Sequence, residues 1–267
     1  MSLQFLKLGG SLITDKNKPG TPRLEVITRL AVEIAEAKVE MGDMRLVLGH
    51  GSGSFGHVPA KKYGTRQGVR TPDQWRGFAE VWREADALNR LVVDALHTAG
   101  LPAVRFAISG SAVTRAGQVA VWDLTSLRAA LVAGLLPVVY GDVVFDQEWG
   151  GTILSTEDIF AHLAKELKPD RVLIAGIEEG VWVDYPACTE IVSEITPGNF
   201  AAVAPALGGS AATDVTGGMA SKVRELLGLV EAVTGLEGVI FSGAYPGRVG
   251  EAIRGKTVGT RIWSGYM

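Results

Sequence analysis

Short apolar runs alternate along the chain with longer segments in which apolar residues recur every three or four positions. Runs of the first kind are typical of buried strands, and segments of the second kind are typical of amphipathic helices. The apolar runs predict strands at 4–8, 45–48, 104–107, 135–140, 171–175, 238–242 and 259–262. The periodic segments predict helices at 24–39, 73–99, 124–133, 156–167 and 214–233. Strands and helices therefore alternate, which predicts a three-layer α/β/α sandwich with a mostly parallel central sheet.

Local signals add three features to this outline. The polar segment 146–151 separates the apolar runs 143–145 and 152–154, which predicts a β-hairpin. Ser155 or Thr156, followed by two acidic residues, predicts the start of the helix that ends near residue 167. The basic segment 59–71 is interpreted either as a mobile loop or short helix beside an anion site, or as a solvated charged face.

The chain has 267 residues, enough for one large α/β domain with a sizeable core. No repeat or low-complexity linker divides it. We expect a single domain over 1–267, with lobes 1–167 and 168–267 that share one continuous sheet.

Composition excludes several classes of function. The formal net charge of −3 argues against a basic nucleic-acid-binding surface. Cys188 is the single cysteine, so internal disulfides and a thiolate metal site are excluded. The N-terminus lacks the layout of a signal peptide, and no apolar run reaches about 18 residues. We therefore expect a cytoplasmic protein with no membrane or nucleic-acid partner.

A glycine-rich segment follows the second predicted strand: residues 47–57 read V-L-G-H-G-S-G-S-F-G-H. Glycines allow backbone N–H groups to approach a bound anion because no Cβ stands in the way. His50 opens this segment and His57 closes it. The pattern is neither a Walker A loop nor a Rossmann fingerprint. By itself it indicates only an anion site.

Two further motifs contain glycine and lysine together. The first strand ends in K-L-G-G-S at 7–11, and D-V-T-G-G-M-A-S-K at 214–222 opens a helix. With the H-G-S-G-S-F-G-H loop and the I-T-D-K segment at 13–16, these motifs resemble the amino acid kinase superfamily. Within it, the chain is similar to the isopentenyl phosphate kinase family over essentially its whole length. The resemblance implies transfer of a phosphoryl group from ATP, with Mg²⁺, to the phosphate of a small isoprenoid. It also implies a homodimer.

The resemblance implies a role for each motif. Catalytic contacts to the phosphates are expected from Lys7, Lys16, His57 and Lys222. Nucleotide contacts are expected from Gly9, Gly10, Ser11, Gly53, Gly217 and Gly218 in addition to Lys7 and Lys222. Acceptor contacts are expected from Ser52, His57 and Thr156, and no protein metal ligand is identified. The alternative for His57 is a purely structural role, in which its side chain caps the backbone of its own loop.

The chemistry agrees with this reading. A phosphate monoester loses its second proton with a pKa near ~6, so it is a nucleophile at neutral pH without a general base. The isoprenoid tail needs an apolar slot, and the resemblance places the helical stripe Phe78, Val81 and Trp82 along one wall. Phe145 and Ile153 are candidates for the opposite wall, and a bulky Trp82 predicts a short slot. The alternative is that all these residues belong to the core.

The sequence departs from the family pattern in two turns. Ile177 and Glu179 stand where the family commonly has aspartates near the nucleotide. Thr156 replaces a glycine near the acceptor phosphate, so that its hydroxyl donates a new hydrogen bond or its Cβ forces a small shift. Asp158 is interpreted as an ordinary acid of the first helical turn, with orientation of Lys16 or of water around Mg²⁺ as the alternative.

Two other functions stay open at this level. A kinase of a small phosphonate such as fosfomycin would use the same anion site and would leave the aromatic stripe in the core. A non-catalytic ligand-binding regulatory protein on the same fold would not need a full set of phosphate-binding lysines.

Overall fold

The computed structural model describes residues 2–207 and 218–265. Its main sheet has eight strands in the order β10-β12-β11-β9-β1-β2-β6-β3. All neighbouring strands in this sheet are parallel except β11 and β12. The strands are β1 Leu3–Leu8, β2 Arg45–His50, β3 Ala103–Arg105, β6 Leu136–Tyr140, β9 Arg171–Gly176, β10 Glu194–Ile195, β11 Glu237–Ser242 and β12 Thr260–Ile262.

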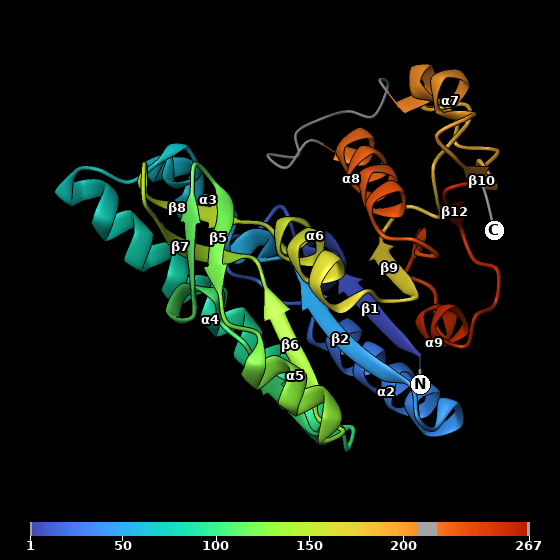
Figure 1. The fold of residues 1–267 in the computed structure, drawn as a ribbon, viewed down its shortest axis with the longest axis horizontal. Coiled ribbons are helices and arrows are strands. Elements are labelled where there is room, and N and C mark those ends of the chain that lie inside the picture. The colour runs from blue at the N-terminus through green and yellow to red at the C-terminus, as the bar shows by residue number, and fades with distance from the viewer. Residues whose placement is uncertain (1, 208–217, 266–267) are drawn as a thin grey trace.

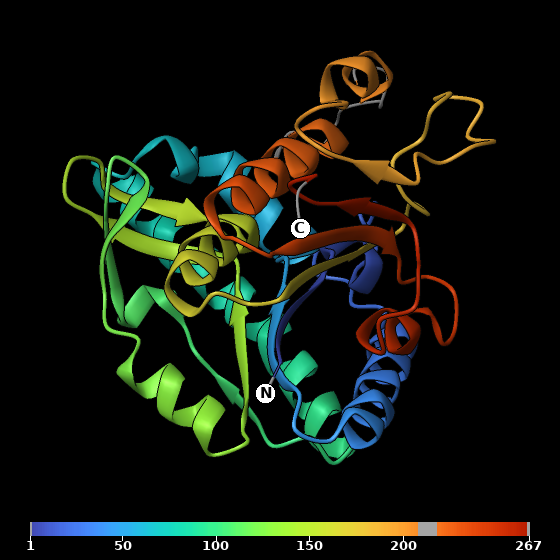
Figure 2. The same cartoon turned by 45° about the vertical axis from the view of Figure 1, so that its right-hand side comes forward.

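Helices cover both faces of this sheet and confirm the predicted three-layer fold (Figures 1 and 2). One face packs against α2 Leu24–Met41, α4 Pro72–Thr98 and α9 Arg248–Ile253. The other packs against α5 Thr125–Val132, α6 Thr156–Leu167 and α8 Gly218–Ala232. The remaining helices are α1 Gly10–Ile13, α3 Gly53–Tyr63 and α7 Phe200–Leu207, with 3₁₀ turns η1 Thr65–Gln67 and η2 Ile108–Gly110. Within the described residues, none of the helices is both long and apolar enough to cross a membrane.

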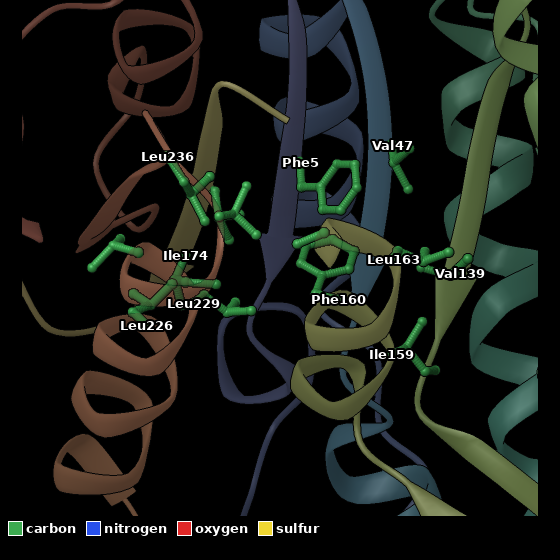
Figure 3. Packing of buried hydrophobic residues seen from close by; sticks show 14 of the residues in the cluster. Phe5, Val47, Val139, Ile159, Phe160, Leu163, Ile174, Leu226, Leu229 and Leu236 are labelled. Carbon is green, nitrogen blue, oxygen red and sulfur yellow. The ribbon is translucent and has the colours of Figure 1, made fainter. Parts of the chain in front are cut away.

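The core is built from strands whose alternate residues face opposite layers. Phe5 of β1 points toward α6, where its ring centroid lies 5.0 Å from that of Phe160 (Figure 3). The next residue, Leu6, belongs to the cluster on the other face. Both side chains are fully buried, as the continuous apolar runs of a parallel sheet require.

A second sheet was not predicted as a separate unit. It has the order β5-β4-β7-β8, with β4 Ala112–Arg115, β5 Gln118–Trp122, β7 Asp142–Asp146 and β8 Gly150–Leu154. The β7–β8 hairpin was predicted, whereas the β4–β5 hairpin was not. The main sheet still runs without a break through strands of both predicted lobes, and Figure 1 shows the small sheet beyond its β6 side. The boundary between the lobes 1–167 and 168–267 would run between β1 and β9, which are neighbours in the main sheet. This division stays a prediction.

The glycine-rich segment is a shorter turn than predicted. Only residues 51 and 52 lie between β2 and α3, and α3 begins at Gly53 and ends at Tyr63. Much of the basic segment 59–71 is therefore helix and 3₁₀ turn. Gly64, with a positive φ of 62°, ends α3 in the left-handed conformation that glycine adopts without strain.

The turns after β1 and β2 contact each other backbone to backbone. A Cβ on Gly10 would lie 2.6 Å from the amide nitrogen of Gly53, which is closer than atoms can approach. The hydroxyl of Thr14 joins the two turns: it donates to the carbonyl of Gly10 at 2.7 Å and accepts from the amide of Ser54 at 3.0 Å. Ligands of open α/β sheets bind at this edge, beyond the carboxyl ends of the strands.

We expect Gly10→Ala to lower the free energy of unfolding by about 1–3 kcal/mol, because the added methyl group overpacks a backbone contact. Gly228→Ala is the matched control: Gly228 is exposed on α8, and its added Cβ meets nothing within 4 Å. That control should gain about 0.5–1 kcal/mol from helix propensity. Urea denaturation of both variants measures the difference. Equal effects of the two substitutions would contradict the close contact of the turns.

Candidate active site

A cavity of about 650 Å³ opens at the edge of the sheet where the glycine turns meet. We call it the central cavity. The predicted residues that line it are Lys7, Gly9, Gly10, Ser11, Lys16, Ser52, Gly53, His57, Val81, Thr156, Gly218 and Lys222. Phe78 and Trp82 are not among the lining residues, and Gly217 lies outside the described part of the chain. The topology thus gathers motifs from both ends of the sequence around one cavity.

Helix starts and lysines make this cavity suitable for anions. The helices α1, α3, α6 and α8 each begin at a residue that lines it: Gly10, Gly53, Thr156 and Gly218. First-turn amides have no acceptor within their own helix, and the helix dipole places partial positive charge there. The side chains of Lys7, Lys16 and Lys222 line the same space. A ligand with several phosphate groups fits such an arrangement.

Glu157 offsets part of this positive charge. Its carboxylate forms an ion pair with the ammonium of Lys7, whose side chain is only 6% exposed. Burial by itself would raise the pKa of Glu157, but the charge and hydrogen bond of Lys7, with a smaller effect of Lys222, lower it below its usual value. Glu157 is therefore ionised and positions the side chain of Lys7 at the carboxyl end of β1.

Sequence reasoning missed Glu157 because two acids stand together in the first turn of α6. Asp158 accounts for the helix start: Ser155 Oγ accepts from the amide of Asp158 at 3.1 Å, and Asp158 Oδ2 accepts from the amide of Ser155 at 2.8 Å. This capping box confirms Ser155 as the N-cap. Asp158 also accepts from Arg66 Nη2 at 3.1 Å. Because Asp158 alone accounts for the cap, the second acid at position 157 had no capping role, and this was the signal that could have identified Glu157.

His50 does not flank the cavity as the sequence suggested. Its side chain is fully buried, stacks on the ring of Tyr140 at 5.4 Å between centroids, and has Nε2 3.1 Å from the side-chain oxygen of Asn89. Burial, the largest influence, lowers the pKa of His50, so the ring is neutral at pH 7. His57 lines the cavity, whereas His50 does not.

The apolar end of the cavity involves one face of α4, and of the predicted stripe Phe78, Val81 and Trp82 only Val81 lines it. Val81 lines the cavity together with Ile153 from β8. Trp82 is 43% exposed because one helical step of 100° turns it away from Val81. Phe78 packs behind the wall, with its ring centroid 5.1 Å from that of Phe145. Phe145 is half exposed and does not line the cavity.

The opposite end of the cavity contains the turn in which the sequence departs from the family pattern. Ile177 and Glu178 line the cavity, and the indole nitrogen of Trp182 donates to Glu178 Oε2 at 2.8 Å. Glu179 accepts a hydrogen bond from the hydroxyl of Tyr245 at 2.8 Å instead of lining the cavity. Trp182 and Tyr185 also line this end and were not identified from the sequence.

Comparisons with known proteins agree with this geometry. Residues 2–242 match the amino acid kinase family. The isopentenyl phosphate kinase of Methanocaldococcus jannaschii is 33% identical, over 97% of this chain and 98% of the relative. That of Haloferax volcanii is 38% identical, over 96% of this chain and 100% of the relative. An X-ray structure of isopentenyl phosphate kinase superimposes with a TM-score of 0.81 at 31% identity, covering 97% of this chain and 99% of that chain.

We expect Glu157→Gln to lower the free energy of unfolding by about 3 kcal/mol at pH 7, because it leaves the buried Lys7 ammonium without its counter-charge. The pKa of Glu157 is lowered on folding, so its ionised form stabilises the protein above the unfolded pKa near 4.5. That contribution is lost as the pH falls through the lower, folded pKa. The difference between wild type and variant should therefore shrink below pH 4.5.

Urea denaturation at pH 7 and at pH 3.5–4.5 measures this difference. Glu40→Gln is the control, since Glu40 pairs with Arg254 on the surface and its loss should cost much less. A Glu157→Gln variant that is as stable as wild type at pH 7 would show that the pair contributes nothing.

Proposed function

The chain belongs to the amino acid kinase family, and we propose that it transfers the γ-phosphoryl group of ATP to the phosphate of isopentenyl phosphate. The product is isopentenyl diphosphate, a building block of isoprenoid biosynthesis. One observation carries the proposal: the lysine-lined phosphate region and an apolar wall at Val81 and Ile153 belong to the same cavity. An acceptor with an anionic head and a short hydrocarbon tail matches both parts.

Catalysis in this proposal consists of positioning and charge neutralisation. Phosphoryl transfer spreads negative charge over the oxygens of the moving group, and fixed cations and N–H donors stabilise that charge. Lys7 and Lys222 would bind the β- and γ-phosphates, and Lys16 would follow the transferred group. The acceptor phosphate, with a second pKa near ~6, attacks as a dianion and needs no general base. His57 would donate a hydrogen bond to it.

ATP is expected to bring Mg²⁺ into the cavity. In the described part of the chain, no group of three or more His, Cys, Asp or Glu side chains is arranged to hold a metal ion. Mg²⁺ in kinases keeps several waters and is held largely by the phosphates of the substrate. A cavity that offers few protein ligands is therefore compatible with Mg²⁺ that arrives bound to ATP. The ion would supply further neutralisation of phosphate charge. The lysines perform the same task from the protein side.

The tail contributes binding energy that a polar acceptor lacks. Burying a five-carbon chain at about 0.8 kcal/mol per CH₂ contributes several kcal/mol. Val81 and Ile153 are the lining side chains available for that contact. A phosphonate kinase would have no use for this wall. A homodimer and a cytoplasmic location rest on the family resemblance and the composition.

We expect His57→Ala to lower kcat/KM for isopentenyl phosphate about 100-fold, because one donor to the reacting phosphate is lost. ADP release with Mg-ATP measures the rate. His97→Ala is the matched control: His97 lies in the last turn of α4, where Nε2 contacts the carbonyl of Ala103 at 2.8 Å. Turnover of fosfomycin but not of isopentenyl phosphate by the wild type would replace the proposed acceptor.

We expect Val81→Thr to raise KM for isopentenyl phosphate several-fold, since it places a hydroxyl of nearly equal size against the tail. Trp82→Ala, one residue further along α4, should leave KM within about twofold, because Trp82 faces solvent. Steady-state kinetics at saturating ATP distinguishes the two positions. A larger effect at Trp82 than at Val81 would mean that the tail lies along a different face of α4.

A further inference from the structure

We propose that Thr156 is a positioning residue that fixes the glycine turn through the carbonyl of His50. Thr156 is the first residue of α6, which is distant from the glycine turn in the sequence but next to it in space. Its hydroxyl donates to the carbonyl oxygen of His50 at 2.6 Å, and its side chain is buried, with the residue 1% exposed. The contact joins segments 106 residues apart.

The carbonyl of His50 lies at the beginning of the turn, and buried hydrogen-bond donors fix its position. It accepts a second hydrogen bond from the amide of Gly141 at 3.2 Å. The amide of Gly51, in the same peptide unit, donates to the carbonyl of Leu8 at 3.1 Å. The peptide that joins residues 50 and 51 is thus held from α6, from the end of β6 and from β1. Its orientation sets the direction in which the chain enters residues 52 and 53.

Thr156 has no second proton to give to a ligand. A hydroxyl has one O–H donor, and this one is used by the carbonyl of His50. Its methyl group occupies space that Gly49 leaves open: a Cβ on Gly49 would lie 2.6 Å from Thr156 Cγ2. The threonine therefore fits beside β2 without displacing it. Of the two effects expected from the sequence, the hydrogen bond occurs, but to the protein backbone and not to the acceptor.

The consequence for activity rests on the proposed function. Ser52 and Gly53 line the cavity at the start of α3, where backbone amides lack intrahelical acceptors. Amides hold a phosphate well only when their direction is fixed before it binds. Thr156 supplies one of the restraints on that direction. Losing it should leave the cavity intact and make the turn mobile.

The test compares Thr156→Val, which keeps the shape and removes the hydroxyl, with Thr156→Ser, which keeps the hydroxyl and removes the methyl group. Hydrogen–deuterium exchange of peptides covering 49–55 reports the turn without reference to any reaction. We expect exchange there to be at least about tenfold faster in Thr156→Val. We also expect kcat/KM for isopentenyl phosphate to fall about 10- to 100-fold, because misplaced groups lose much of their effect. Thr156→Ser should restore both to within about threefold of wild type.

Thr260→Val is the matched control for the loss of a buried hydroxyl. Thr260 is fully buried on β12, and its hydroxyl donates to the carbonyl of Val192 at 2.7 Å and accepts from the amide of Val181 at 2.8 Å. Its substitution should lower the melting temperature at least as much, because it also leaves the amide of Val181 without this acceptor, and should leave exchange at 49–55 unchanged. Faster exchange at 49–55 in both valine variants would reduce the effect to general destabilisation and overturn the proposal.

The other outcomes are equally decisive. Wild-type exchange and kinetics in Thr156→Val would overturn the proposal, and so would equal damage in the serine and valine variants, which would assign the effect to the methyl group. If the wild type fails to phosphorylate isopentenyl phosphate but the exchange pattern is as expected, the proposed function fails and the positioning role stands.

Discussion

The fold of the site depends on one contact: the turns after β1 and β2 meet with no side chain between them. Adjacent parallel strands end at the same edge, so the two turns are necessarily neighbours. Only glycine at position 10 allows the backbone of Gly53 to approach so closely. This contact brings the starts of α1 and α3 to one point, with Lys7 as the next-to-last residue of β1. The phosphate contacts proposed for Lys7, Gly9, Gly10 and Gly53 depend on this arrangement.

Gathering cations at one edge of the sheet has an electrostatic cost, and Glu157 at the start of α6 supplies a counter-charge. Lys7, Lys16 and Lys222 come from three separate segments and line one cavity. Glu157 lowers the repulsion among them when no nucleotide is bound, as the lowered pKa of its carboxyl indicates. The start of α6 therefore has two tasks. Glu157 holds a lysine, and Thr156 holds the backbone of the glycine turn.

Periodicity and motifs predicted most of the fold, including the helix of α4 and the β7–β8 hairpin, because those signals are local. The β4–β5 hairpin was missed because Ala116 and Gly117, which turn it, are held by Asp146, 29–30 residues away. The direction in which side chains point also could not be predicted from the sequence. Val81 and Trp82 are adjacent apolar residues, and only packing decides which faces the cavity. His50 likewise shares a motif with His57, but it is fully buried and does not line the cavity.

The central claim is that one cavity joins a phosphoryl donor to a phosphate carried on a short hydrocarbon. Phosphorus NMR of the protein with Mg-ATP and isopentenyl phosphate observes that bond directly. We expect the monophosphate resonance to be replaced by two coupled diphosphate resonances, in step with the formation of ADP. ADP that accumulates while the monophosphate resonance persists would show transfer to water. No change in either compound would contradict the claim.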